Sequence, residues 1–260
     1  MSIPAHIPTT PPKSAAIFIA CLTDGFYPRT GVAIVKILEK LGLRVEFPAE
    51  QTCCGQMFFN NGYHADSLRL AKRFIEVFEP YESIVSPSAS CTAMVREQFP
   101  ELLQNDPDWR ERMQAVASKT YDFIEFLVKV MKVDVTKYTL PAPRTFTYHY
   151  TCHQRGLGLR DEAANLLKQI GNVQFTPMEK GDQCCGFGGT FAIKYPAISG
   201  AMVEDKVRNI EKTGAETTIC NDAGCVMNIS GMCNRHGIKT DVTHLANVLA
   251  EAMGIDTDEL

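Results

Sequence analysis

The chain has 260 residues, of which 45% are hydrophobic and 22% charged, and its formal net charge is −4. This composition is typical of a globular protein with one large core or two cores of about 120 residues each. Because the charge is slightly negative and no run of Lys or Arg offsets it, nucleic acid and anionic membrane surfaces are poor candidates for partners.

The N-terminal segment, residues 1–14, has four prolines in its first thirteen positions, and this composition predicts a disordered tail. The apolar run at 15–22 is too short to span a bilayer and lacks the flanks of a signal peptide, so we interpret it as a buried strand. Without an export signal we expect a cytoplasmic protein with reduced thiols. Its ten cysteines therefore indicate metal ligands rather than disulfides.

An internal repeat organises the rest of the chain. Each copy begins with an apolar strand that leads into a cysteine, and a helical pattern, a glycine and a second strand follow. These elements are predicted at 16–20, 30–41 and from 45 in the first copy, and at 145–150, 161–170 and from 173 in the second. Gly42 and Gly171 follow the helical patterns, where a left-handed residue is expected to end each helix.

Later in each copy a second helix and a short strand lead to the last cysteine. The helices are predicted at 64–78 and 198–213, and the strands at 83–86 and 216–219. An acidic stretch at 100–119 belongs to the first copy alone and is interpreted as a surface helix. This alternation predicts an α/β fold of two tandem duplicated Rossmann-like β-α-β units with parallel sheets. The expected domains are 15–136 and 144–255, with a linker at 137–143.

A Cys-Cys-Gly motif occurs in both copies, at 53–55 and 184–186. One cysteine precedes each pair by 32 positions, and another follows it by 37 or 40. Because the carboxyl ends of parallel strands form the binding edge of a sheet, the four cysteines of each copy are expected to converge there. The candidate ligands are Cys21, Cys53, Cys54 and Cys91 in the first copy and Cys152, Cys184, Cys185 and Cys225 in the second.

Four thiolates can hold zinc, copper(I) or an iron–sulfur cluster. Structural zinc usually takes two Cys-x2–4-Cys pairs, whereas directly adjacent cysteines favour different irons of a larger cluster. Gly55 and Gly186, together with Gly188 and Gly189 of the run GFGGT, can bring backbone amides close to cluster sulfides. The motif favours an iron–sulfur cluster without fixing its type, and it leaves zinc open at one site or both. Our expectation is one [4Fe-4S] cluster per copy.

Two further cysteines and two histidines lie in the second copy. Cys233 is interpreted as a small buried hydrophobe, and Cys220 as either the same or an additional ligand of the second site. His149 is expected to be structural and bonded to a backbone carbonyl. His153 follows a ligand cysteine and is interpreted either as structural in the same way, or as a group that contacts a ligand cysteine or moves a substrate proton. No flavin or nicotinamide motif and no catalytic residue can be identified.

Two copies of Cys-x31-Cys-Cys-Gly-x35–38-Cys resemble the cysteine-rich CCG domain of heterodisulfide reductase and of the iron–sulfur subunits of glycolate and anaerobic glycerol-3-phosphate dehydrogenases. Within that superfamily, FPAEQTCCGQ, IVSPSASC, CCGFGGTF, MVEDKV and GCVMNISG resemble the lactate utilization protein A family. The resemblance covers nearly the whole chain after residue 15.

The resemblance implies an electron-transfer subunit of a cytoplasmic L-lactate dehydrogenase that forms pyruvate. A ferredoxin-like iron–sulfur subunit and a third small subunit are its implied partners. Ser88 and Asp222 stand where heterodisulfide reductase has a fifth cysteine, so the noncubane cluster of that enzyme is not expected. Two alternatives stay open: a zinc or mixed-metal scaffold, and a heterodisulfide-reductase-like redox subunit that acts on another substrate. A thiol–disulfide enzyme is a weaker third.

Overall fold

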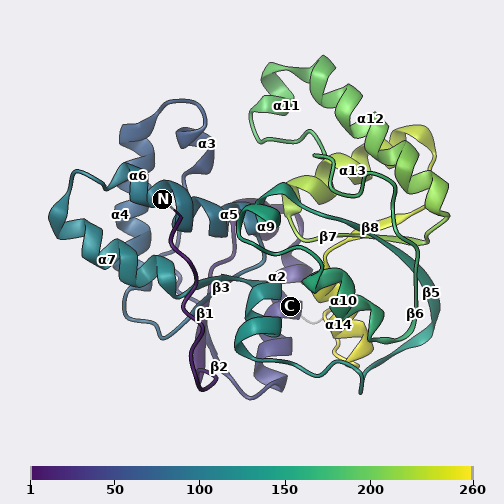
Figure 1. Ribbon diagram of the computed structural model, residues 1–260, viewed down its shortest axis with the longest axis horizontal. Helices are drawn as coiled ribbons and strands as arrows, with labels where there is room; N and C mark the ends of the chain where they lie inside the picture. Colours follow the sequence, from purple (N-terminus) through teal and green to yellow (C-terminus); the bar gives the residue numbers. More distant parts are fainter. Residues whose placement is uncertain (1, 259–260) are drawn as a thin grey trace. The chain divides into compact units, whose positions relative to one another are not determined.

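The computed structural model describes residues 2–258 and divides the chain into two compact units, with the boundary between Val133 and Asp134. Figure 1 shows that each unit contains one sheet flanked by its own helices. Both sheets have four strands, all parallel, and both have the strand order 2-1-3-4 within their unit. The predicted fold class, a tandem duplication of parallel α/β units, is confirmed.

Unit 1 comprises residues up to Val133. Its strands are β1 (Ser14–Ile17), β2 (Arg44–Glu46), β3 (Ile84–Ser86) and β4 (Thr120–Asp122). Its helices are α1 (Cys21–Phe26), α2 (Pro28–Lys40), α3 (Gln56–Phe59), α4 (His64–Phe78), α5 (Ala89–Ala93), α6 (Phe99–Leu102), α7 (Pro107–Ser118) and α8 (Phe123–Glu125), with π-helical turns η1 (Met94–Gln98) and η2 (Phe126–Val130). The surface helix expected within 100–119 is α7.

Unit 2 begins at Asp134. Its strands are β5 (Thr139–His149), β6 (Gly171–Phe175), β7 (Thr217–Cys220) and β8 (Asp241–Thr243). Its helices are α9 (Cys152–Gly156), α10 (Glu162–Lys168), α11 (Phe191–Lys194), α12 (Pro196–Thr213), α13 (Ala223–His236) and α14 (Leu245–Ala252). Most of the predicted linker at 137–143 is therefore the first part of β5.

The N-terminal segment was expected to be disordered, but it lies on unit 1. The Ile3 amide donates to the Arg96 carbonyl over 2.8 Å, and Arg96 Nε donates back to the Ile3 carbonyl over 2.9 Å. The Tyr121 hydroxyl donates to the His6 carbonyl over 2.6 Å. An extended proline-rich segment has no internal hydrogen bonds, so its backbone carbonyls can accept hydrogen bonds from side chains such as those of Arg96 and Tyr121. Composition alone did not reveal these partners.

The two helix-ending glycines behave differently. Gly42 has φ +91°, as a left-handed residue after α2 should. Gly171 does not have a positive φ; the next residue, Asn172, does, at +65°. Gly171 instead begins β6, where an added Cβ would lie 2.4 Å from Thr139 Oγ1. The left-handed conformation predicted for Gly171 is wrong, because this glycine permits two strands to approach closely.

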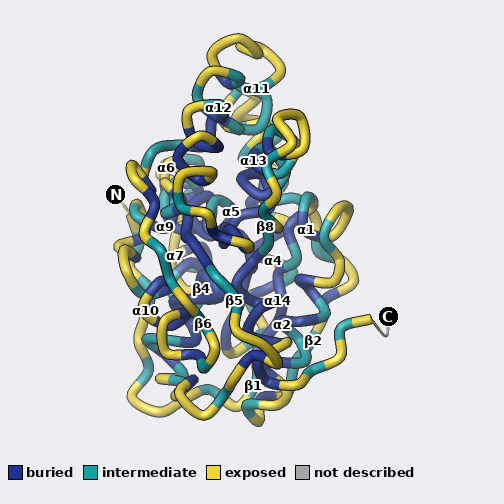
Figure 2. Tube along the Cα trace, turned by 90° about the vertical axis from the view of Figure 1, so that its right-hand side faces the viewer, coloured by how far each residue is buried: buried dark blue, intermediate teal, exposed yellow. Residues whose placement is uncertain are grey.

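The inner elements of both units are buried (Figure 2). Strands β3, β4 and β7 are buried at every position. The core of unit 1 is rich in phenylalanine: the Phe18 ring lies 4.8 Å from that of Phe74 and 5.5 Å from that of Phe78, edge to face. No helix among residues 2–258 is both long enough and apolar enough to cross a lipid bilayer.

Candidate metal centres

The four predicted ligands of unit 1 meet at the carboxyl ends of three neighbouring strands. Cys21 begins α1 after β1, Cys53 and Cys54 lie in the loop after β2, and Cys91 lies in α5 after β3. The Sγ atoms of Cys21 and Cys53 are 3.9 Å apart, and those of Cys54 and Cys91 are 3.3 Å apart. The sheet order β2-β1-β3 thus brings together thiols that are far apart in the sequence.

Unit 2 repeats this arrangement. Cys152 begins α9 after β5, Cys184 and Cys185 lie in the loop between β6 and α11, and Cys225 lies in α13 after β7. The Sγ atoms of Cys185 and Cys225 are 3.0 Å apart, and the Cys152 thiol lies within hydrogen-bonding reach of Cys184. Each unit therefore gathers its own set of four thiols.

Both sets are layered in the same way between solvent and core. Cys21 and Cys152 are exposed, whereas Cys53 and Cys184 are half-buried. The remaining two members of each set are buried, and all ten cysteines are free thiols. Each site therefore has two thiols that solvent can reach and two that are buried beneath them.

The glycine of each Cys-Cys-Gly motif directs a backbone amide at the first thiol of the pair. Gly55 has φ +85° and Gly186 has φ +80°, values that favour glycine. Their N–H groups donate to Cys53 Sγ and Cys184 Sγ, each over 3.4 Å. A serine on the next long helix fixes each glycine carbonyl: Ser67 donates to that of Gly55, and Ser199 to that of Gly186. The local backbone is thus arranged to stabilise negative charge on sulfur.

Without a metal, each set stabilises one thiolate. Hydrogen bonds from Cys21 and Cys54 lower the pKa of Cys53 to about 2. The shared hydrogen bond with Cys53, followed by burial, raises the pKa of Cys21, and hydrogen bonds with Cys53 and Cys91 raise that of Cys54. In unit 2, Cys184 takes the place of Cys53, and its pKa also falls to about 2. Four thiolates at such distances require a positive charge among them.

The donor sets fit a metal centre. Sulfur ligands select zinc, copper(I) or iron–sulfur clusters. The Sγ–Sγ separations of 3.9, 3.3 and 3.0 Å lie at or below the edge of about 3.8 Å that a tetrahedral ion with Zn–S bonds of about 2.3 Å would have. Convergence, free thiols and the amide donors together support metal binding in both units.

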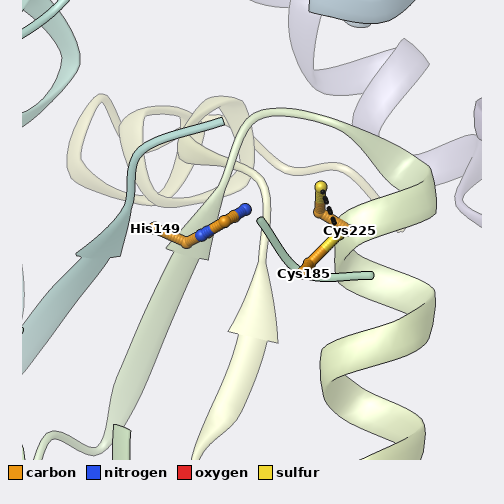
Figure 3. A group of neighbouring side chains, drawn as sticks. All are labelled: His149, Cys185 and Cys225. Carbon is orange, nitrogen blue, oxygen red and sulfur yellow. Dashed lines mark hydrogen bonds between the residues drawn. The ribbon is translucent and has the colours of Figure 1, made fainter. Parts of the chain in front are cut away.

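The two sites differ in what lies at the end of the central strand. Phe18 of unit 1 follows β1, and its amide donates to the Val85 carbonyl of β3. The corresponding residue of unit 2 is His149, the last residue of β5, which pairs with Cys220 of β7. One ring nitrogen of His149 and the Sγ atoms of Cys185 and Cys225 lie within 4.8 Å of one another (Figure 3).

A second difference lies on the long helix behind each Cys-Cys-Gly loop. Phe74 lies seven residues after Ser67 on α4. Lys206 lies seven residues after Ser199 on α12, so the two residues occupy equivalent places relative to these serines. Lys206 is fully buried, and its Nζ donates to the carbonyls of Lys180 over 2.8 Å and Gly181 over 3.1 Å. Unit 2 thus has an imidazole and an ammonium where unit 1 has two phenylalanines in contact.

The remaining predicted residues lie around the unit 2 site. His153 Nδ1 is 3.7 Å from Cys152 Sγ. Gly188 and Gly189 both have positive φ and precede α11. Cys220 and Cys233 are buried; among the described residues, Cys220 does not belong to the group formed by His149, Cys185 and Cys225.

Sequence reasoning interpreted His149 as a structural residue and did not single out Lys206. The signal that could have found both is the repeat itself. The register of the cysteines places His149 opposite Phe18, and alignment of Ser67 with Ser199, one residue further along, places Lys206 opposite Phe74. A polar residue opposite a core aromatic residue indicates a special environment.

The fold and the two thiol sets define a duplicated cysteine-rich domain protein. The cysteine-rich domain family named CCG matches residues 15–96 and 146–230. Proteins named lactate utilization protein A are 46% identical over 235 residues in Halalkalibacterium halodurans (90% of this chain, 95% of the relative) and 44% identical in Bacillus subtilis (90% and 98%). The chain belongs to the lactate utilization protein A family, within the CCG cysteine-rich domain proteins.

One solved structure shows the same fold. A hypothetical protein from Helicobacter pylori superposes with a TM-score of 0.62 at 13% sequence identity. The alignment covers 97% of this chain and 52% of that one. At this identity the likeness shows the fold alone.

Proposed function

We propose that this protein is the iron–sulfur electron-transfer component of a cytoplasmic complex that oxidises L-lactate to pyruvate, with one [4Fe-4S] cluster in each unit. The observation that carries the proposal is the pair of four-thiol sets, each built around Cys-Cys-Gly at the carboxyl edge of a parallel sheet. The name of the relatives, lactate utilization protein A, supplies the link to lactate.

A bound cluster would supply one-electron transfer, and the chain's own residues would set its environment. The eight shared cysteines are the ligands, Cys220 is a further candidate, and the Gly55 and Gly186 amides stabilise thiolate charge. Ser88 and Asp222 act as helix caps: Ser88 Oγ accepts from the Cys91 amide, and Asp222 Oδ1 accepts from the Gly224 amide. They orient the helices that carry the last cysteine of each set, which supports four thiols per cluster rather than five.

Oxidation of lactate itself is assigned to partner subunits, namely the ferredoxin-like iron–sulfur subunit and the third small subunit. Large apolar side chains are exposed on the short helices that follow each Cys-Cys-Gly and on their neighbours, and such patches are typical of docking surfaces. They are Phe26, Met57, Phe58 and Tyr63 in unit 1 and Ile193, Tyr195 and Ile198 in unit 2. Partners that dock there would lie beside the thiols.

The test is anaerobic purification of the full chain, followed by iron and sulfide analysis and electron paramagnetic resonance (EPR). We expect a brown protein with broad absorption, several irons and a matching amount of sulfide per chain. Reduction with L-lactate should require the partner subunits. A colourless protein that contains only zinc after anaerobic iron–sulfur reconstitution would contradict the proposal.

A second candidate is a zinc-stabilised scaffold that organises partner subunits without carrying electrons. The observation that favours it is the sulfur spacing, which resembles the edge of a tetrahedral mononuclear site. Metal analysis of full-length variants in which one set of cysteines is replaced by serine separates the candidates. Iron with sulfide in the intact set supports a cluster, and one zinc without sulfide supports the scaffold.

A further inference from the structure

His149 is a buried polar side chain whose ring nitrogens have no hydrogen-bond partner. The residue is 1% exposed, and neither Nδ1 nor Nε2 makes a hydrogen bond of acceptable geometry, although the Gly181 backbone lies near enough to affect its pKa. Buried polar groups in folded proteins nearly always have a partner, so the ring of His149 has room for one, whether a water, an ion or another ligand.

The ring is directed at the thiol set. It extends from the end of β5 toward the Sγ atoms of Cys185 and Cys225, which come from the loop after β6 and from α13 (Figure 3). These three side chains are all buried, and their ligand atoms lie within 4.8 Å of one another. Imidazole and thiolate together bind zinc and iron in proteins.

The neutral imidazole is the form that binds a metal, and burial of His149 among apolar and sulfur-bearing side chains favours that form. Lys206 does not compete for the metal through this position, because its Nζ is already bonded to the carbonyls of Lys180 and Gly181.

We propose that His149 is a ligand of the metal centre in unit 2, on the side of Cys185 and Cys225. This inference rests on the proposed metal centre and goes beyond it. The two centres then differ in their donors, since unit 1 offers thiolates alone and unit 2 offers thiolates and one imidazole. Phe18 occupies the corresponding place in unit 1 and has no donor atom.

The consequence for an iron–sulfur centre is a difference in reduction potential. A neutral imidazole donates less negative charge than a thiolate does, and histidine ligation raises the potential of iron–sulfur centres. The nearby ammonium of Lys206 acts in the same direction. Electrons that enter the chain should therefore rest on the unit 2 centre.

The decisive experiment uses the full chain labelled with ¹⁵N-histidine, purified anaerobically, in which Cys54→Ser removes the unit 1 centre. Pulsed EPR should show a nitrogen coupling at the unit 2 centre that changes between ¹⁴N-histidine and ¹⁵N-histidine samples. The coupling should be lost in His149→Phe and kept in His153→Asn, the control for the other nearby histidine. If the bound metal is zinc, the same samples are measured after exchange to cobalt(II).

A unit 2 centre that contains metal but shows no histidine coupling would overturn the inference and leave the proposed function intact. Absence of metal from both sets would instead contradict the proposed function. As a second measurement, His149→Phe should weaken metal retention in unit 2 by at least about tenfold and leave unit 1 unchanged. Retention equal to that of the unsubstituted chain would also count against His149. Phenylalanine is the matched replacement because Phe18 stands at the corresponding place in unit 1, and thermal unfolding of the variant checks that unit 2 is still folded.

Discussion

Units 1 and 2 share their strand order and the placement of four thiols, and they differ in the side chains behind those thiols. Phe18 and Phe74 pack edge to face in unit 1, whereas His149 and Lys206 occupy these places in unit 2. The sheet edge that carries the four thiols is therefore the same in both copies, while the core below it differs. A comparison of the two copies therefore separates the residues needed to form a centre, the shared thiols, from those expected to set its stability and reduction potential, the side chains behind them.

The largest effect is expected from loss of a buried thiol. Cys185→Ser should remove the unit 2 centre, and Cys54→Ser the unit 1 centre, each with loss of the folding free energy that the metal contributes. On the proposed ligation by His149, and with Cys220 and the glycine-rich loop as further candidate donors, unit 2 holds its centre more firmly, so Cys185→Ser should cost more iron and more thermal stability. Metal analysis and calorimetry of the anaerobic proteins measure both quantities.

On slow exposure to air or to a chelator, the unit 1 centre of the unsubstituted chain should empty first. Equal losses from the two serine variants, or better retention in unit 1, would show that the residues around the thiols do not set the stability of the centres.

A second test asks whether unit 1 can be weakened alone. Arg96 and Glu125 form an ion pair over 2.7 Å, and each side chain is at most 4% exposed. Glu125→Ala leaves the guanidinium buried without its carboxylate, and we expect a loss of about 3–5 kcal/mol in the free energy of unfolding. Denaturant unfolding should show this loss in unit 1. Arg112→Ala, which breaks a largely exposed pair with Glu79, is the control and should cost about 1 kcal/mol or less.

A matched pair of glycine substitutions tests the two Cys-Cys-Gly loops. Gly55→Ala places a Cβ 3.1 Å from Ser67 Oγ at φ +85°, which should cost about 1–2 kcal/mol. Gly186→Ala places a Cβ 2.8 Å from the Ser199 carbonyl oxygen and 2.9 Å from Met202 Cβ, so overpacking should add about 1–3 kcal/mol. Thermal unfolding and metal content check the order. A larger effect at Gly55 would contradict the contacts described for the unit 2 loop.

The smallest change in stability is expected for Lys206→Met. The carbonyls of Lys180 and Gly181 lose their donor, but a buried charge is also removed, so the net loss should be about 1 kcal/mol. The reduction potential of the unit 2 centre should fall, because a nearby positive charge favours the reduced form. Redox titration followed by EPR measures this shift, and Phe74→Met in unit 1 is the control, which should leave the potential of either centre unchanged.

Sequence patterns were sufficient for the elements that are long or strongly periodic. The helix α4 begins and ends where its apolar pattern predicts, and the parallel topology follows from the alternation of strands and helices. The edge strands β4 and β8 were missed, although β2 and β3 are equally short and were predicted, because neither edge strand precedes one of the repeated cysteine motifs. The packing of the N-terminal segment on unit 1 was not predicted, because it depends on hydrogen bonds from Arg96 and Tyr121, which are far away in the sequence.

For the site, spacing predicted which thiols meet, because the carboxyl edge of a parallel sheet is fixed by topology. The environment behind them could not be predicted in the same way. A lone histidine such as His149 is most often satisfied by a backbone carbonyl, and a lysine such as Lys206 is rarely fully buried. Only the packing of α12 against the Cys-Cys-Gly loop shows that Lys206 turns inward to the carbonyls of Lys180 and Gly181.

The layering of each thiol set also determines where chemical damage begins. In the metal-free protein, peroxide from solvent can reach the two outer sulfurs of each set, since Cys21 and Cys152 are exposed, Cys53 and Cys184 are half-buried, and the other two members are buried. Sulfenic acid should form at the thiolate of each set, Cys53 or Cys184, and the exposed neighbour, Cys21 or Cys152, is positioned to condense with it into a disulfide. That reaction is reversible by thiol reductants, so an outer pair of this kind would spare the inner thiols from irreversible oxidation and allow the site to be rebuilt.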